Sequence, residues 1–556
     1  MAKVLPAPLI GSSSQWMHSA QYTRDLFRRI VLTRQPLHGL VIRKSGENGR
    51  SAVPSPGWNR GEKTESRQTM NELDMSELDP RLNRRPANIR HIHLLGICGT
   101  GMAALAGMLQ KSGYLVTGSD QQVYPPMSDF LTMAGIAIKS PYAAANLHPQ
   151  PDLAIVGNVI RKSNPEAQEL ARLGIAYLSF PQALAQFFIA GKMSLVVAGT
   201  HGKTTTSALL ASALVHAGYD TSFMIGGIVR EFNGNFRLGS GEHVVLEGDE
   251  YDTAFFDKGS KFLHYQPHAA ILTSLEFDHA DIFQDLAAVE AVFARFVALP
   301  PEDGLLVAFL DDPKVAAAAT RARCRVAGYG LHPAREWRLA DVRQDGDGGS
   351  SHFTVFRHSQ FFGEFTLPLP GRHNCLNALA VVALLHHFGL DAATIAAGLA
   401  AFGGVKRRQE VRGIEKGITV IDDFAHHPTA VKETLSALKA AYTGRRLVAV
   451  FEPRTNSSRR AIFQRDYALA FDDADMILLR QPVPLPDVGP EMMFSSKKLT
   501  DDLRRRGKNA RVFPEAEAII AALLPELKEN DVVAILSNGG FDGIHERLLS
   551  ALRERH

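Results

Sequence analysis

Short apolar runs alternate with amphipathic stretches from His91 onward, while the residues before it show no sustained period. The first part of the pattern predicts strands over 91–96, 114–118 and 153–156, and helices over 102–111, from Asn164 and over 181–190. Strands that alternate with helices in this way indicate a parallel sheet with helices on its faces. Gly191-Lys192 is a plausible boundary after this unit.

A second α/β unit follows this boundary. It is predicted to open with a strand over 194–198, a glycine turn and a long helix over 203–217, followed by buried strands over 244–247 and 269–273. Residues 337–367 alternate polar and apolar positions between Gly/Asp turns, which predicts an antiparallel flap or small sheet. Helices are then expected from Asn374 and Ala392.

A third unit begins near Lys406. It alternates helices with strands predicted over 419–422, 447–451, 476–479 and 532–536. The expected fold class is therefore α/β, with domains over 89–190, 191–405 and 406–556 after an extension over 1–88. A length of 556 residues fits this division, because domains average roughly 150 residues.

The extension differs from the rest of the chain in composition. Residues 1–90 hold 15 Lys and Arg against 8 Asp and Glu, a net +7, which leaves −4 for the remainder. Low hydrophobicity with this basic excess predicts disorder. Two prolines interrupt Val4–Ile10, which argues against a secretory signal. A transit-like peptide is one alternative, and an over-long start assignment is favoured, since Met70 and Met75 lie just before the ordered pattern.

Bulk composition narrows the class of protein. No apolar run approaches the ~20 residues of a membrane helix, and Cys98, Cys324 and Cys375 are too scattered for a disulfide framework or zinc site. We therefore expect a soluble protein of the reducing cytoplasm. The net charge of +3 does not argue for nucleic acid, and we expect a monomer or weak dimer.

The strongest motif is Gly199-Thr200-His201-Gly202-Lys203-Thr204-Thr205-Thr206, placed between a strand and a helix. Glycines let the backbone aim its N–H groups at phosphate oxygens, and a helix N-terminus adds partial positive charge. Lys203 is suited to neutralise phosphate charge and the Thr204 hydroxyl to bind Mg²⁺. The spacing departs from the full Walker A pattern, because Val197 stands where that pattern has Gly. The run predicts a nucleoside triphosphate site.

This run is similar to the nucleotide loop of the Mur ligases, and the resemblance extends over roughly His91 to Arg553. It implies a Rossmann-like UDP-binding domain, a central P-loop ATPase domain and a Rossmann-like C-terminal domain. It also implies ATP-dependent amide-bond formation through an acyl phosphate. The residues that it assigns to ATP in this loop are Gly199, Thr200, Gly202, Lys203, Thr204 and Thr205.

Carboxylates end the next strands, where hard oxygen ligands suit Mg²⁺. Within Leu246–Asp252 the resemblance assigns Glu247 to the metal, with Gly248 in place of the usual Ala. Within Thr273–His279 it assigns His279 to a second Mg²⁺, so that Thr204, Glu247 and His279 form the implied metal set. The first lysine beyond His279 is Lys314, so we expect no carbamylated lysine here.

Further blocks carry the rest of the implied nucleotide site. Asn374 is a natural helix N-cap, and the family places Asn374 and Asn377 beside the adenine and phosphates. Arg408 aligns with the arginine that the third domain brings to the phosphates. In Asp422–Pro428, Asp423 is expected near the ribose and His426 near the phosphates. Lys203, His279 and Arg408 are the implied catalytic residues.

The first strand is followed by Gly96-Ile97-Cys98-Gly99-Thr100-Gly101, with Asp120 about 20 residues on. Alone this loop is compatible with NAD or any pyrophosphate, which leaves a dehydrogenase as an alternative. That alternative does not explain the second nucleotide loop. The resemblance assigns Gly99, Thr100, Gly101 and Asp120 to a sugar nucleotide, with Asn158 and Ser163 as weaker candidates.

Smaller blocks separate two branches of the family. Glu250–Lys258, Leu275–Phe283, Phe451–Asn456 and Ser537–His545 resemble the branch that couples a recycled tripeptide to UDP-N-acetylmuramate, although Gly259 replaces a usual Arg. Arg454 and Asn538 lie at strand ends of the third domain, and Arg454 is suited to hold a peptide carboxylate. No general base stands out. The open alternatives are the alanine-adding branch, a folylpolyglutamate-type ligase, the NAD enzyme and an inactive nucleotide sensor.

Overall fold

The computed structural model describes residues 78–124, 127–486 and 488–555. The predicted extension, as far as residue 77, lies outside the described residues. Within the described part the chain forms three α/β domains, each built around one main sheet. This confirms the predicted fold class.

The first domain holds a five-stranded parallel sheet in the order β3-β2-β1-β4-β5. Its central strand pairs on both sides, since Ile92 lies opposite both Val116 and Leu153. The strands are β1 (His91–Leu95), β2 (Leu115–Ser119), β3 (Ala137–Lys139), β4 (Leu153–Val156) and β5 (Ala176–Ser179). The helices are α2 (Thr100–Lys111), α3 (Met127–Met133), α4 (Pro165–Leu173) and α5 (Phe180–Leu184), the last continued by a π-helical turn over Ala185–Ile189.

Ordered contacts with the first domain begin before residue 89, the predicted start of that domain. Asp79 caps a short 3₁₀ helix over Pro80–Leu82 by accepting from the backbone N–H of Arg81. The Asn83 side-chain amide then donates to the Tyr177 carbonyl at 3.1 Å. The contact of Asn83 with Tyr177 joins groups 94 residues apart in sequence, which the local pattern of apolar residues does not reveal.

The central domain holds a ten-stranded sheet in the order β17-β16-β15-β14-β13-β12-β6-β9-β7-β8. Its strands are β6 (Met193–Ala198), β7 (Ser222–Val229), β8 (Gly234–Arg237), β9 (His243–Glu247), β12 (Ala269–Leu272), β13 (Leu305–Phe309), β14 (Arg325–Gly330), β15 (Trp337–Gln344), β16 (Ser351–Arg357) and β17 (Gln360–Leu367). A separate hairpin pairs β10 (Asp252–Ala254) with β11 (Asp257–Ser260). The helices are α6 (Lys203–His216), α7 (Leu286–Val297), α8 (Pro313–Ala319), α9 (Arg372–His387) and α10 (Ala392–Ala400).

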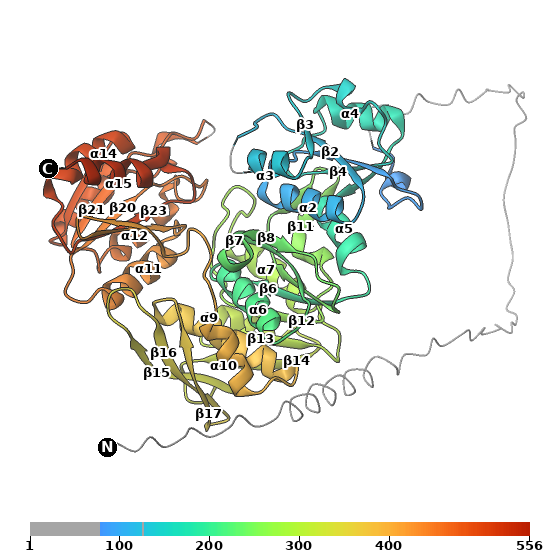
Figure 1. The fold of residues 1–556 in the computed structure, drawn as a ribbon. Coiled ribbons are helices and arrows are strands. Elements are labelled where there is room, and N and C mark those ends of the chain that lie inside the picture. Colours follow the sequence, from blue (N-terminus) through green and yellow to red (C-terminus); the bar gives the residue numbers. More distant parts are fainter. Residues whose placement is uncertain (1–77, 125–126, 487, 556) are drawn as a thin grey trace, which may run out of the picture. The chain divides into compact units, whose positions relative to one another are not determined.

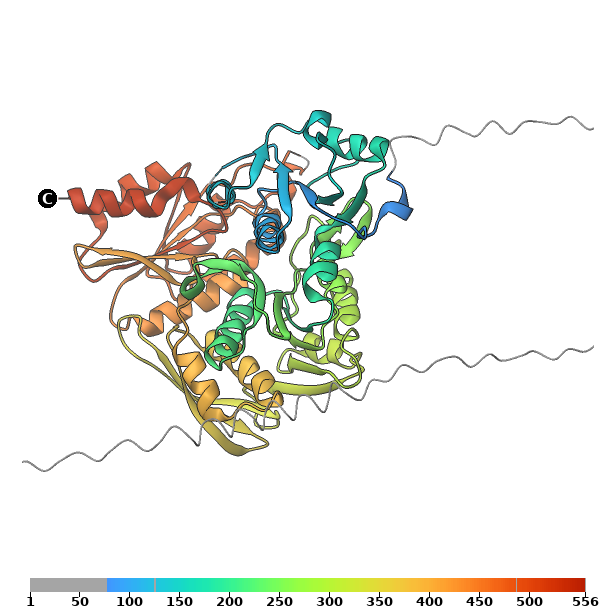
Figure 2. The same cartoon turned by 45° about the vertical axis from the view of Figure 1, so that its right-hand side comes forward.

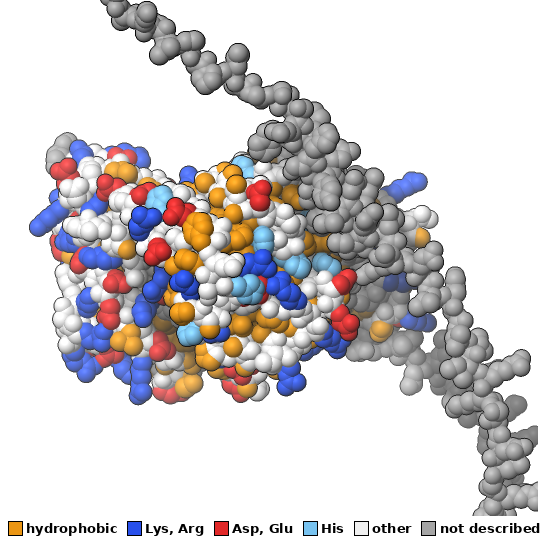
Figure 3. Space-filling model, turned by 90° about the horizontal axis from the view of Figure 1, so that it is seen from below, with side chains coloured by type: hydrophobic (Ala, Val, Ile, Leu, Met, Phe, Trp, Pro, Cys, Tyr) orange, Lys and Arg blue, Asp and Glu red, His pale blue; other side chains and the backbone are white. Residues whose placement is uncertain are grey.

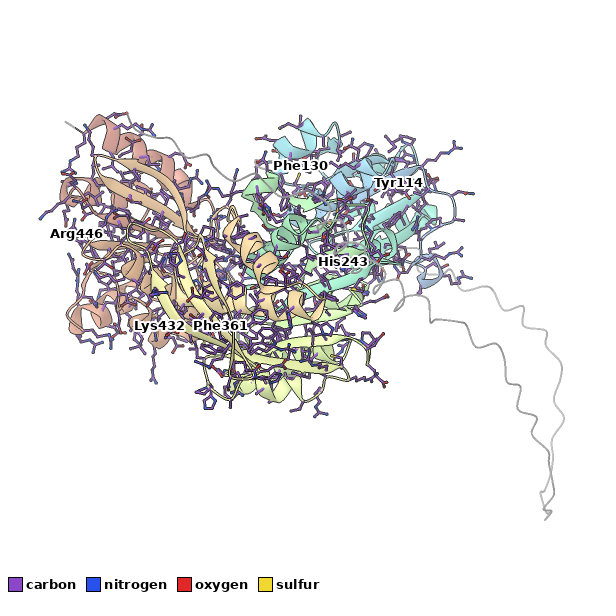
Figure 4. The ribbon with its side chains drawn as sticks, turned by 60° about the horizontal axis from the view of Figure 1, so that its bottom comes forward. Tyr114, Phe130, His243, Phe361, Lys432 and Arg446 are labelled. Atoms are coloured by element: carbon purple, nitrogen blue, oxygen red, sulfur yellow. The ribbon has the colours of Figure 1, made fainter. Side chains whose placement is uncertain are left out.

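The predicted antiparallel flap over 337–367 is the three strands β15, β16 and β17. It does not form a sheet of its own, because Tyr329 of β14 pairs with Trp337 of β15 and joins it to the parallel strands. Figures 1 and 2 show this flap from two directions. Its outer hairpin carries the exposed Phe361, labelled in Figure 4.

The C-terminal domain holds a six-stranded sheet in the order β18-β19-β23-β20-β21-β22, in which only the edge strand β18 runs antiparallel. Helices α11 to α13 pack on one face and α14 and α15 on the other (Figure 1). The strands are β18 (Glu410–Glu415), β19 (Ile418–Asp423), β20 (Leu447–Phe451), β21 (Met476–Arg480), β22 (Asn509–Phe513) and β23 (Val532–Leu536). The helices are α11 (Pro428–Ala441), α12 (Gln464–Ala470), α13 (Ser496–Arg505), α14 (Ala516–Leu523) and α15 (Ile544–Glu554).

The segment that leads into the C-terminal domain is tied to an edge region of the central sheet. Val405 forms an antiparallel bridge with Val229 at the end of β7. Backbone hydrogen bonds from Lys406 N to Ile228 O (2.9 Å) and from Arg230 N to Gly404 O (3.0 Å) flank this bridge. The connection is therefore ordered by main-chain pairing up to Lys406.

On the face in Figure 3, basic, acidic and apolar side chains are interspersed rather than separated into one charged field. Among the described residues, no helix has the length and apolar character needed to cross a bilayer.

Candidate functional site

The nucleotide loop leaves β6 and enters α6, as the sequence predicts. Gly199 and Gly202 have φ of +133° and +80°, conformations that side chains with a Cβ rarely adopt. A Cβ at Gly202 would also lie 2.7 Å from Asn377 Oδ1. The loop therefore requires glycine at Gly202, and it directs the first N–H groups of α6 toward the space beside Asn377, where an anion is favoured.

Lys203 is held by the carbonyls of Gly199 and Thr200, the latter at 3.4 Å, and by one carboxylate. Its Nζ donates to Gly199 O at 2.7 Å and forms an ion pair with Glu250 at 2.9 Å. Burial disfavours the ammonium, but the carboxylates of Glu250 and Glu247 outweigh that penalty and raise the pKa of Lys203. Lys203 is thus a fixed positive charge. Sequence reasoning missed Glu250, because only the fold brings it to the loop.

Thr204 and Glu247 form a compact pair of oxygens. The Thr204 hydroxyl donates to Glu247 Oε1 at 2.9 Å, and the other Glu247 oxygen accepts from Gly226 N at 2.7 Å. Adjacent oxygens of an octahedral Mg²⁺ with bonds of 2.0–2.1 Å lie about 2.9 Å apart. The spacing and the hard-oxygen chemistry of these two side chains therefore fit Mg²⁺.

His279 lies apart from this pair, and its assignment to a second Mg²⁺ stays a prediction. Its Nε2 is 2.9 Å from Glu250 Oε1, and its ring packs on Tyr251 with 4.2 Å between centroids. Burial lowers the pKa of His279, but the adjacent Glu250 carboxylate outweighs this and gives a net increase. The structure thus shows Thr204 with Glu247, and His279 with Glu250 and Lys203.

A cavity of about 520 Å³ opens beside the nucleotide loop. Its walls come from the central and C-terminal domains, and a volume of this size suits a small-molecule ligand. The predicted residues among its lining are Gly202, Thr204, Thr205, Asn374, Asn377, Arg408 and Asp423. Apolar side chains that the sequence did not single out complete it, namely Phe309, Tyr329, Leu331, Leu369 and Leu376.

Three residues of the C-terminal domain were predicted to lie near ATP, namely Arg408, Asp423 and His426, and the structure places them differently. Arg408 reaches the loop, where its Nη2 donates to Thr204 Oγ1 at 3.1 Å. Asp423 is buried and accepts from the backbone N–H groups of Gln409 and Ala425, both at 2.8 Å. His426 instead lies outside the cavity lining, with its Nε2 3.8 Å from Asp278.

Asn374 does not cap its helix, so that prediction is wrong. Helix α9 begins at Arg372 with Gly371 as its N-cap residue. The Asn374 side chain instead donates to Pro370 O at 2.7 Å. The helix starts earlier because Gly371, at φ +105°, makes the required turn.

The glycine loop of the first domain is built as predicted, with Gly99 as N-cap of α2 and Thr100 and Gly101 in its first turn. Asp120 accepts from the backbone N–H of Cys98 at 2.9 Å, which ties the loop to the residue that follows β2. Asn158 and Ser163 are exposed. None of these contacts identifies a ligand.

Arg454 follows β20 and is exposed, with no ion pair among the described residues. Its side chain lies over Gly539, where a Cβ would meet it at 2.4 Å. The buried Oδ1 of Asn538 has no hydrogen-bond partner in the described structure. Ser457 Oγ accepts from Ala280 N at 3.1 Å, so the loop after β20 contacts the segment just after His279.

Comparison with known proteins gives a consistent result for all three domains. Family models described as "Mur ligase family, catalytic domain", "Mur ligase middle domain" and "Mur ligase, glutamate ligase domain" match residues 91–191, 197–385 and 407–539. The UDP-N-acetylmuramate–L-alanyl-γ-D-glutamyl-meso-2,6-diaminoheptandioate ligase of Escherichia coli is 38% identical over 84% of this chain and 98% of its own length. The UDP-N-acetylmuramate–L-alanine ligase of Caldanaerobacter subterraneus is 32% identical over 83% of this chain and 97% of its own.

Solved structures agree with these relatives. A murein peptide ligase from Psychrobacter arcticus superposes with a TM-score of 0.63 at 35% identity, covering 84% of this chain and 99% of its own. A UDP-N-acetylmuramate–alanine ligase from Thermotoga maritima gives a TM-score of 0.70 at 26% identity, covering 84% and 100%.

Proposed function

The chain belongs to the Mur ligase family, and we propose that it joins the tripeptide L-alanyl-γ-D-glutamyl-meso-diaminopimelate to UDP-N-acetylmuramate and converts ATP to ADP and phosphate in doing so. The observation that carries a ligase activity is the cavity shared by the nucleotide loop and the C-terminal domain, where Arg408 meets Thr204. The choice of a peptide acceptor rests on the relatives named for that reaction. It also rests on Arg454, which is exposed and forms no ion pair among the described residues. Such a reaction belongs to the reuse of cell-wall peptides, and we propose the cytoplasm as its compartment.

In the first step the lactoyl carboxylate of UDP-N-acetylmuramate attacks the γ-phosphorus of ATP. A carboxyl oxygen–phosphorus bond forms, the bond to ADP breaks, and an acyl phosphate results. Two anions must approach one another, so preorganised positive charge is the main requirement. Lys203, Arg408 and the N-terminus of α6 supply it. Thr204 and Glu247 would hold Mg²⁺, which neutralises further phosphate charge when bound.

In the second step the α-amine of the tripeptide attacks the acyl carbon. The new carbon–nitrogen bond replaces the carbon–oxygen bond to phosphate, and the nitrogen loses a proton. We place the acceptor against the loop after β20, because Ser457 links that loop to the segment following His279. Arg454 then has a charge to offer a distal carboxylate, and Asn538 directly precedes Gly539, over which the Arg454 side chain lies.

The sugar nucleotide is assigned to the first domain, on the N-terminus of α2 at Gly99, Thr100 and Gly101. A helix N-terminus favours a diphosphate. Asp120 acts there through the loop backbone, since it already accepts from Cys98 N.

An ADP-release assay tests the proposal. The full chain is supplied with ATP, Mg²⁺ and UDP-N-acetylmuramate, and with either L-alanine or the tripeptide as acceptor. We expect ADP release to require the tripeptide. Preference for free alanine would assign the chain to the alanine-adding branch, and release of no ADP with either acceptor would reject a ligase. Gel filtration of the same protein tests for the expected monomer or weak dimer.

A further inference from the structure

Three side chains meet at the edge of the cavity and have no part in the proposed reaction. His201 comes from the nucleotide loop, Glu276 follows β12, and His427 caps α11 of the C-terminal domain. His201 Nε2 lies 3.1 Å from Glu276 Oε2, and His427 Nδ1 lies 3.5 Å from the same oxygen. The two imidazoles face one another with 4.6 Å between ring centroids.

The spacing of these three ligand atoms matches a tetrahedral metal site. A Zn²⁺ ion with bonds of 2.0–2.1 Å holds neighbouring ligand atoms about 3.4 Å apart. The separations of 3.1 and 3.5 Å bracket that value, and all three atoms lie within 4.8 Å of one another.

The surroundings of the cluster orient its ligands in the way that metal-binding histidines require. His427 Nε2 donates to Phe277 O at 3.3 Å, so Nδ1 carries the lone pair, which accepts from Thr429 N, and lies 3.5 Å from Glu276. Metal-bound histidines commonly donate their second N–H to a carbonyl in this way. Thr429 fixes the carboxylate, because its hydroxyl donates to Glu276 Oε2 at 2.7 Å.

The one hydrogen bond that a cation would displace at His427 Nδ1 is the long one from Thr429 N, at 3.3 Å.

We propose that His201, Glu276 and His427 bind a divalent transition-metal ion of the Zn²⁺ class. Two imidazoles and one carboxylate select such an ion over Mg²⁺, which prefers oxygen ligands. Three protein ligands leave a fourth position for water, on the side where His201 and Glu276 line the cavity. The ion would bind the nucleotide loop to the first turn of α11 and so hold the central and C-terminal domains together.

The test uses the full chain without an affinity tag, in excess Mg²⁺ so that oxygen sites are filled. Co²⁺ is added as a spectroscopic substitute and Zn²⁺ in competition with a chromophoric chelator. His427→Asn removes one ligand while keeping a good helix cap, and Glu276→Gln removes the charge while keeping an acceptor for Thr429. His216→Asn is the matched control, because His216 also pairs with a glutamate at 3.1 Å, Glu231, but without a third ligand.

We expect the wild type and the His216→Asn control to show the strong visible absorption of tetrahedral Co²⁺ and to bind Zn²⁺ with equal affinity. Both ligand variants should lose this absorption. Their Zn²⁺ affinity at this site should fall by more than the roughly 10- to 100-fold that loss of an outer-shell partner costs. Zn²⁺ should also raise the Tm of the wild type and of the His216→Asn control, but not that of the two ligand variants. Equal Zn²⁺ stoichiometry and affinity in all four proteins, or only weak octahedral Co²⁺ absorption, would overturn the proposal.

Discussion

The guanidinium of Arg408 donates to the hydroxyl of Thr204 at 3.1 Å, a contact between residues 204 positions apart. It places a positively charged side chain of the C-terminal domain beside a residue whose hydroxyl suits Mg²⁺. The centroid of the Phe424 ring lies 4.8 Å from the guanidinium carbon of Arg408. We therefore expect Arg408→Ala to lower kcat by on the order of 10²–10³, as loss of one preorganised charge does. Steady-state ADP release measures the change.

Lys406→Ala is the control for this experiment, since Lys406 is a nearby exposed lysine. Its kcat should stay close to that of the wild type. Equal losses in both variants would show that the basic segment acts through its overall charge and not through Arg408.

Lys203 has a structural partner as well as a proposed catalytic role. Lys203→Ala should lower turnover by on the order of 10²–10³. It should also lower the Tm, because it leaves the Glu250 carboxylate buried without its main counter-charge. Removing one member of a buried pair typically costs about 3–5 kcal/mol.

The double variant Lys203→Ala/Glu250→Gln separates these two effects. It should recover much of the Tm, measured by thermal unfolding, without recovering turnover. A single Lys203→Ala variant with unchanged turnover would remove Lys203 from the mechanism.

Arg454 tests acceptor recognition. A charge-assisted hydrogen bond contributes about 1.5–3 kcal/mol, so Arg454→Ala should raise the KM for the tripeptide roughly 10- to 100-fold. The KM for ATP should change little, because Arg454 does not line the nucleotide cavity. Arg505→Ala, on an exposed face of α13, should leave both values unchanged. An unchanged tripeptide KM in Arg454→Ala would place the acceptor elsewhere.

Because His373 is partly buried, we expect part of the free energy of unfolding to be lost in acid. Burial lowers the pKa of His373 from 6.5 to about 4. Between these values the unfolded chain binds a proton that the folded protein does not, so stability falls as the pH is lowered through this window. The Tm of His373→Gln should therefore fall less than that of the wild type from pH 6.5 to 4. His358→Gln, at an exposed histidine, should follow the wild type, and parallel curves for all three proteins would contradict the assignment.

The sequence predicts best those elements that are buried over their whole length. The strands at Leu153–Val156, Leu447–Phe451 and Val532–Leu536 have the predicted bounds, because each is a short run of buried apolar residues. Strand β18 (Glu410–Glu415) was not predicted. It lies at a sheet edge and its residues are largely exposed, so it has no apolar signal.

The candidate site likewise has one part that the sequence predicts and another that it does not. The nucleotide loop could be predicted because its residues are consecutive and its glycines are required by the backbone. The pairing of Glu250 with Lys203 and His279 could not, since it depends on where separate strand ends meet. The same is true of Asn83, whose partner Tyr177 belongs to a later strand.

The main-chain bridge between Val229 and Val405 determines where the C-terminal domain can turn. Main-chain hydrogen bonds hold the chain to the central sheet up to Lys406. A rotation of the C-terminal domain relative to the central domain therefore has to occur about the residues just beyond Lys406. Arg407 and Gln409, both with positive φ, flank Arg408 at this point. Arg408 therefore lies beside this pivot, and it would remain near the nucleotide while parts of the C-terminal domain farther from the pivot move more.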